Sequence, residues 1–69
     1  MITGKTLRLL RTLKGIKQAS LARKLGISQQ AYSKIEKCNH LGTERLQTIL
    51  IAMDCTMQDL ELLNQLSST

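Results

Sequence analysis

The sequence predicts an all-α fold, a compact bundle of five short helices. Proline is absent and glycine occupies only four of the 69 positions, so few residues would break a helix. Apolar residues recur at the spacing of one helix face in five stretches, and no stretch alternates as a strand would. Hydrophobic residues make up 42% of the chain, which supplies the aliphatic side chains that so small a core requires.

Helix boundaries follow from glycines and from side chains that can cap a helix. Gly15 and Gly26 can adopt the left-handed conformation that ends a helix, so the first two helices should stop there. Ser28 can cap the third, because its hydroxyl accepts from the free amides of the first turn. Thr43 and Thr56 are expected to precede the fourth and the fifth, and Asp59 completes a capping box with Thr56. The predicted helices span about 3–14, 18–25, 29–37, 44–53 and 57–66.

Each predicted helix carries one apolar stripe, and these stripes should together form the core. Ile27, between the second and third helices, is expected to insert into it, and Cys55 should fill a small core position. The stripes consist of Leu7, Leu10, Leu21, Ala22, Leu25, Tyr32, Ile35, Leu46, Ile49, Leu50, Met53, Leu60 and Leu63.

Charge is distributed unevenly along the chain. Residues 1–40 hold nine Lys or Arg and one acid, a net charge of +8, whereas residues 41–69 hold one Arg and four acids, a net charge of −3. A basic half on a small protein favours a polyanionic partner over an ordinary solvated surface. The length predicts one domain over residues 1–66, and residues 67–69 should fray.

Several functional classes are not expected. No apolar run approaches the roughly 20 residues that span a bilayer, and no signal segment is apparent, so a cytoplasmic protein without membrane contact is expected. Cys38 and Cys55 should then stay reduced, although the pattern also allows one disulfide. With His40 they are too few for a four-ligand zinc site. No nucleophile–base pair and no phosphate loop is present, so neither an enzyme nor a cofactor is expected.

The second and third predicted helices are separated only by residues 26–28. Such a short turn fixes two helices at a steep angle, and Ala22 supplies the small side chain that their close approach requires. If Tyr32 and Ile35 face the core, the opposite face of the third helix carries no acid. That face holds Gln29, Gln30, Ser33, Lys34 and Lys37.

This acid-free face matches the major groove of B-DNA. Gln can pair with N6 and N7 of adenine, and Lys can donate to O6 and N7 of guanine. An ordinary solvated face is the alternative, but solvated faces usually mix Glu with Lys. The pattern therefore favours base reading by Gln29, Gln30, Ser33 and Lys34.

The stretch LRLLRTLKGIKQASLARKLGISQQAYSKIEK resembles the helix-turn-helix of phage repressors, Cro-type proteins and Xre-like bacterial regulators. The similarity continues through MDCTMQDL and covers about residues 5–63. It implies a lambda-repressor-like DNA-binding domain with the helix-turn-helix at the second and third helices. The residues that carry it are Gln18, Leu21, Ala22, Leu25, Gly26, Ile27, Ser28, Tyr32, Ser33, Ile35 and Glu36.

The resemblance also implies roles for single residues. Gln18 matches a glutamine that holds a phosphate and braces the start of the recognition helix. Arg11 and Glu36 match an ion pair between the first helix and the recognition helix. Gln29, Gln30 and Lys34 match base-reading positions. Around them, phosphate contacts are expected from Lys17, Gln18, Lys37, Asn39, His40 and Thr43.

Two positions depart from the family pattern at helix ends. Cys38 stands where the family usually has glycine, so Asn39 is expected to take the left-handed turn instead. Asp54 replaces a common glycine at the end of the fourth helix. The path of residues 38–42 is therefore open.

Five further residues are apolar where the family is often polar, which suggests either a wider core or a dimer patch. Leu9 and Leu13 fit both explanations equally, whereas Ile51, Leu62 and Leu66 favour the dimer. A two-fold dimer would place two recognition helices about 34 Å apart, one DNA turn, on a palindromic site.

The expected function is sequence-specific binding of double-stranded DNA by a transcriptional regulator, a repressor that acts mainly by occlusion. A cytoplasmic, nucleoid-associated protein of bacterial or phage type is expected. The alternatives are an antitoxin or a partner-recruited module that docks through its last helix, and a structural domain without DNA binding. The operator, the regulated genes and any inducer do not follow from the sequence.

Overall fold

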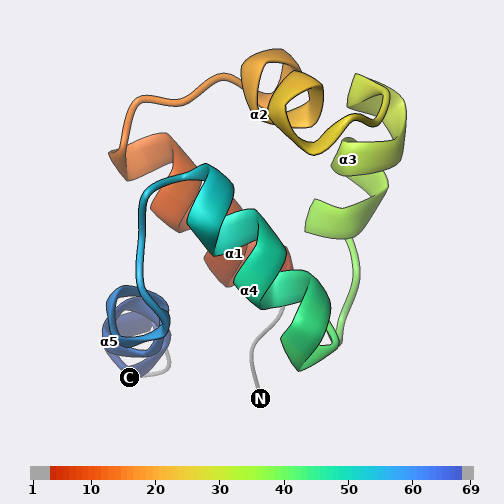
Figure 1. Cartoon of the computed structure of the whole chain (residues 1–69). Coiled ribbons are helices and arrows are strands. Elements are labelled where there is room, and N and C mark those ends of the chain that lie inside the picture. The colour runs from red at the N-terminus through yellow and green to blue at the C-terminus, as the bar shows by residue number, and fades with distance from the viewer. Residues whose placement is uncertain (1–3, 68–69) are drawn as a thin grey trace.

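The computed structural model describes residues 4–67, which form five helices and, over that range, no strand (Figure 1). The radius of gyration is 10.9 Å, so the helices form a compact bundle. The predicted all-α five-helix class is confirmed. The helices are α1 (Gly4–Leu13), α2 (Gln18–Leu25), α3 (Gln29–Glu36), α4 (Thr43–Ala52) and α5 (Met57–Ser67).

The observed boundaries lie within about one residue of the predicted ones. The main difference is at α4, which begins at Thr43 with Gly42 as its N-cap, so the prediction that Thr43 precedes the helix is wrong. Ser67 still belongs to α5, whereas the predicted first residue of α1 and the rest of the predicted fraying lie outside the described residues.

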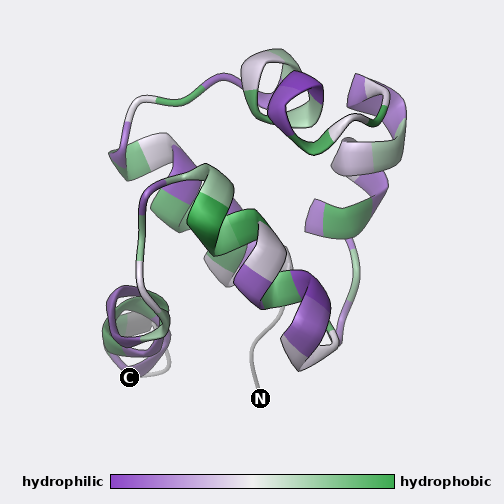
Figure 2. Cartoon of the chain, in the orientation of Figure 1, coloured by the Kyte–Doolittle hydropathy of each residue, from purple (hydrophilic) through white to green (hydrophobic). Residues whose placement is uncertain are grey.

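The helices pack in a connected chain of pairs. α1 packs against α3 and α5, and α2 packs against α3 and α4. The Thr6 hydroxyl donates to Asn64 Oδ1 at 3.1 Å and ties α1 to α5. In Figure 1 the α2–α3 pair and α5 lie on opposite sides of the bundle, and Figure 2 shows apolar and polar residues alternating around the helices.

The core is the predicted aliphatic cluster around Tyr32, with two corrections. Leu41, in the loop before α4, is buried although its stretch is not helical. Ile27 is 38% exposed, so the prediction that it inserts into the core is wrong. In the turn that ends α2, the Ile27 amide donates a hydrogen bond to Ala22 O. The side chain of Ile27 then points outward. Leu25, Ile35, Leu63 and Cys55 pack against the core while remaining partly exposed.

Most helix ends follow the predicted chemistry. Gly26 adopts a φ of 72°, and its amide bonds Arg23 O. The Ser28 hydroxyl accepts from the Ala31 amide at 3.1 Å. The Thr56 amide donates to Asp59 Oδ2 at 2.9 Å, and the Asp59 amide donates back to Thr56 Oγ1 at 3.3 Å, which completes the predicted capping box.

The left-handed turn occurs at Asp54 and not at Asn39. Asp54 has a φ of 58° and is the single non-glycine residue of the described range with positive φ, so the prediction for Asn39 is wrong. α3 ends instead through Lys37, whose φ of −96° and ψ of −2° allow its amide to bond Lys34 O. This tight last turn needs no left-handed residue after it.

Gly4 brings the start of α1 against the end of α3. Its amide donates to Cys38 O at 2.9 Å. A Cβ at this position would lie 2.6 Å from Glu36 O and closer still to Ile35 O. The two helices can approach this closely because residue 4 has no side chain.

Candidate nucleic-acid interface

α3 presents its polar stripe to the outside. Gln29, Gln30 and Lys34 are exposed and Ser33 is partly buried. On the opposite face Tyr32 has no exposed surface. The four side chains predicted to read bases therefore lie on the accessible side of one short helix.

A depression lies on each flank of this stripe, and charged residues line only one of the two. One flank is a hollow of about 400 Å³ that we call the polar hollow, lined by Gln18, Ser28, Gln29, Gln30 and Ser33. The other is a groove of about 730 Å³ between α3 and α4, the α3–α4 groove. Its lining mixes aliphatic residues, among them Leu25, Ile27, Ile35 and Ile49, with polar ones, and its charged residues are Lys34, Glu44 and Arg45.

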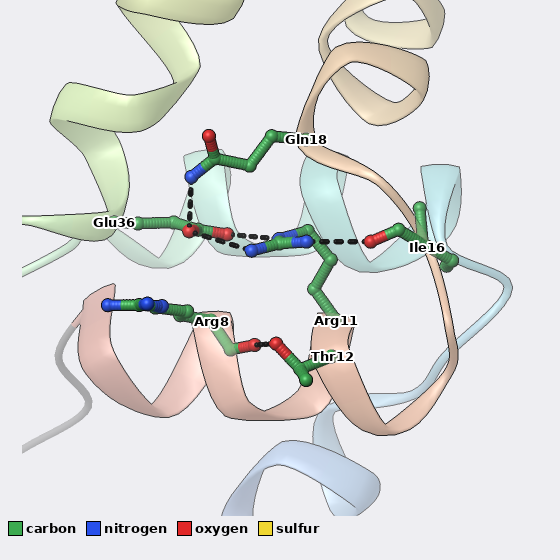
Figure 3. A network of polar contacts seen from close by, with 6 residues as sticks. All are labelled: Arg8, Arg11, Thr12, Ile16, Gln18 and Glu36. Carbon is green, nitrogen blue, oxygen red and sulfur yellow. Dashed lines mark hydrogen bonds and ion pairs between the residues drawn. The ribbon is translucent and has the colours of Figure 1, made fainter.

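A buried charge network holds the end of α3 (Figure 3). Arg11 Nε donates to Glu36 Oε2 at 2.6 Å, and the two side chains are only 12% and 3% exposed. Arg11 Nη1 also donates to Ile16 O at 2.6 Å, and Gln18 Nε2 donates to Glu36 Oε1 at 2.8 Å. The last residue of α3 is thus bonded to both α1 and α2.

The network stabilises charged Glu36 and charged Arg11. Burial alone would raise the pKa of Glu36, but the Arg11 hydrogen bond and then the smaller donors outweigh it and lower that pKa below 4.5. The same hydrogen bond raises the pKa of Arg11. Burial, and then the neighbouring Glu36 carboxylate, raise the pKa of Tyr32. Its hydroxyl forms no hydrogen bond with any residue that the structure describes.

α2 and α3 are joined by a turn of three residues, 26–28, and the outer side of α3 carries the polar stripe. The helix-turn-helix family model of the Cro/C1 type matches residues 7–60, from α1 into α5. The chain belongs to the Cro/C1-type helix-turn-helix family. That is a family of DNA-binding transcription regulators and is not typically enzymatic. Searches of curated proteins and of solved structures find no match.

In this helix-turn-helix protein Gln18 differs from its expected place. The resemblance implied that it braces the start of the recognition helix, but its Nε2 donates to Glu36, the last residue of α3. Glu36 Oε1 accepts from Gln18 Nε2 at 2.8 Å and from Arg11 Nη2 at 3.3 Å. Gln18 nevertheless lines the polar hollow beside Gln29.

The predicted phosphate-binding residues of the helix-turn-helix protein lie at helix ends. Lys17 is the N-cap of α2, Lys37 is the C-cap of α3, and Thr43 is the first residue of α4. Asn39 and His40 are exposed in the loop between them. The Gln18–Glu36 hydrogen bond brings the start of α2 to the end of α3. Lys17 precedes Gln18 and Lys37 follows Glu36, so the two lysines lie in the same region of the surface.

Sequence reasoning missed Arg45. It is exposed on α4 and lines the α3–α4 groove with Lys34. Arg45 is the single base of the acidic half and lies far in sequence from the basic cluster, so only the packing of the helices brings it to the same groove as Lys34. The sequence does contain a clue to Arg45, because it lies two residues after Thr43, in the first turn of α4 and close to a predicted phosphate contact.

The remaining candidates assemble into no second site among residues 4–67. Cys38 and Cys55 are both free thiols. Within that range no three His, Cys, Asp or Glu side chains gather as metal ligands. Nor is any helix there long and apolar enough to cross a membrane.

Proposed function

We propose that this helix-turn-helix protein binds specific sequences of double-stranded DNA and represses transcription by placing α3 in the major groove. The observation that carries this proposal is the exposed, acid-free stripe of Gln29, Gln30 and Lys34 on a helix whose last residue is held by a buried ion pair. A reading helix must be rigid, because base discrimination depends on hydrogen bonds of defined direction.

The side chains divide into base readers and phosphate holders. Gln29 and Gln30 suit the N6 and N7 edge of adenine, Lys34 suits guanine, and Ser33 lies beside them at the edge of the polar hollow. Phosphate contacts fix the position of a protein on the duplex without reading sequence. The residues proposed for this role are Lys17, Gln18, Lys37, Asn39, His40 and Thr43.

We further propose that the protein acts as a homodimer on a palindromic site, in the cytoplasm of a bacterial or phage-type system. The candidate interface residues Ile51, Leu62 and Leu66 are 77%, 60% and 65% exposed, which is unusual for large aliphatic side chains. Two copies related by a two-fold axis would bury such side chains and present two α3 helices to one face of the duplex.

DNA binding and sequence preference can be measured separately. Binding to random duplex DNA across a salt series tests the electrostatic contribution, and selection from a random pool then tests readout. Salt-dependent binding with enrichment of a palindrome is expected. Absence of salt-dependent binding would remove the proposed function, and binding without enrichment would remove its sequence specificity.

Variants assign the two roles on the selected duplex. Gln29→Ala and Gln30→Ala should each relax preference at one base pair, at a cost of about 1–3 kcal/mol. Lys17→Ala should weaken binding to all sequences alike and lower the salt slope by about one. A sequence-selective effect of Lys17→Ala would contradict the assignment.

A second candidate function is a protein-interaction module, such as an antitoxin, that docks through α5. Its support is the pair of exposed leucines on that helix, Leu62 and Leu66. The selection experiment separates the two, because a module of this kind need not enrich any DNA sequence.

A further inference from the structure

α1 and α5 contain the same leucine pattern with opposite charges. Residues 7–13 read LRLLRTL and residues 60–66 read LELLNQL, so leucine occupies the first, third, fourth and seventh positions of both. The second position is Arg8 in α1 and Glu61 in α5. The two helices lie at opposite ends of the chain, so local sequence context does not explain the match.

The structure uses the two patterns in the same way. The first leucine of each, Leu7 or Leu60, has no exposed surface. The third and seventh leucines lie one helical turn apart on the outer face. Their exposed fractions are 39% and 66% for Leu9 and Leu13, and 60% and 65% for Leu62 and Leu66.

The exposure of Leu9 and Leu13 decides between the two explanations offered for them, a wider core and a dimer patch. The wider intramolecular core in which they would be buried is not formed, although α5 does pack against α1. That packing uses the inward side of both helices. Each helix therefore presents a second, outward leucine pair to solvent.

The two outward faces are complementary in charge. The exposed charged residues of α1 are Lys5 and Arg8, whereas those of α5 are Asp59 and Glu61. Within the part of the chain that the structure describes, the ion pair is that of Arg11 with Glu36 on α3. Arg8 and Glu61 are both exposed and are not joined in that way.

We propose that the outward face of α1 in one copy packs against the outward face of α5 in a second copy, and reciprocally, in a closed two-fold dimer. Leu9 and Leu13 would contact the partner's Leu62 and Leu66, and Arg8 would lie beside the partner subunit's Glu61. Because α1 and α5 are neighbours in each subunit, the same contact can form twice around one axis. This inference deepens the proposed dimer, and its test requires no DNA.

A pairing of α5 with a second α5 fits the observations less well. It would bring together two helices that each carry acids and no base, and like charges across an interface oppose association. It would also leave the outward leucines of α1 exposed. The α1–α5 pairing covers both leucine pairs and places opposite charges together.

Charge reversal tests the pairing directly. Sedimentation velocity would compare the wild-type chain with Arg8→Glu and with Glu61→Arg, each alone and in an equimolar mixture. Each single variant should raise the dimer dissociation constant about tenfold or more, because both symmetric contacts then oppose like charges. In the mixture every contact regains opposite charges, so a heterodimer should form with a dissociation constant within about threefold of the wild-type value.

The controls keep the outcome clear. Both residues are exposed, so circular dichroism and thermal melting should show folded variants. A wild-type chain that stays monomeric at about 100 μM would overturn the inference, as would assembly into open oligomers. So would a dimer that is insensitive to Arg8→Glu, particularly if Ile51→Ser weakened it. Failure of DNA binding with an intact charge-reversal result would instead overturn the proposed function alone.

Discussion

The two ends of α3 are held in different ways. Its last residue, Glu36, accepts hydrogen bonds from Arg11 on α1 and Gln18 on α2, and Gly4 packs against the backbone beside it. At its first turn the Ser28 hydroxyl caps the helix by accepting from the Ala31 amide, and Gln29 and Gln30 beside it are exposed. α3 is therefore held to the rest of the protein at its buried C-terminal end. Its N-terminal end exposes polar side chains to solvent.

The largest effect should come from removing the buried cation. Arg11→Ala would leave the Glu36 carboxylate, 3% exposed, without its charged partner, and should lower the free energy of unfolding by about 3 kcal/mol. Urea denaturation measures this, with Lys5→Ala as the control because Lys5 is exposed on the same helix. Equal effects of the two variants would show that the network does not hold α3.

The close approach of Gly4 gives the next effect. Gly4→Ala would drive a Cβ into the Ile35 and Glu36 carbonyls and should cost about 2–3 kcal/mol, since backbone atoms cannot yield as a side chain can. Gly42→Ala is the matched control, because a Cβ there meets no atom within 4 Å and the change should stay within about 1 kcal/mol. If Gly4→Ala were as mild as its control, the contact between α1 and α3 would be wrong.

Low pH should weaken the interactions of Glu36 that hold the C-terminal end of α3. The pKa of Glu36 is lowered by folding, so its contribution to stability is full above pH 4.5 and is lost as the pH falls through the lowered pKa. Glu36→Gln should therefore be less stable than wild type at neutral pH and should lose less stability between about pH 6 and pH 3. Asp59 titrates in both proteins and cancels in the difference. Parallel pH profiles would contradict a charged Glu36 anchor.

The open end should give the smallest effect. Ser28→Ala removes the cap of α3 and should cost about 1 kcal/mol. Ser20→Ala, at an exposed position inside α2, should be neutral or slightly stabilising, because alanine favours a helix interior. A cost for Ser28→Ala as large as that for Arg11→Ala would abolish the contrast between the two ends.

The same contrast explains what could be predicted from sequence. The exposed stripe of α3 follows from the helical period alone, once Tyr32 faces inward. The Arg11–Glu36 pair spans 25 residues and was suggested only by family resemblance, because no local pattern relates residues so far apart. The bond from Gln18 to Glu36, the burial of Leu41 and the shared position of Arg45 and Lys34 along one groove depend on how the helices pack.

The errors concern backbone paths between helices. The apolar type of Ile27 predicts a core position, but the turn after α2 directs the side chain outward. The family pattern predicts a left-handed Asn39, but the tight turn through Lys37 makes this unnecessary. In each case residue type was known, and the direction of the chain was not.

Asp54 has a consequence for the evolution of stability. A residue with a side chain costs free energy at a φ of 58°, which glycine would not. Asp54→Gly should therefore raise the melting temperature, with a gain of up to about 1 kcal/mol by chemical denaturation. Since Asp54 lies between α4 and α5, away from α3, the stability gained there would offset destabilising substitutions on the outward stripe of α3, where the proposed base contacts lie. New binding preferences would then be reachable without loss of the folded state.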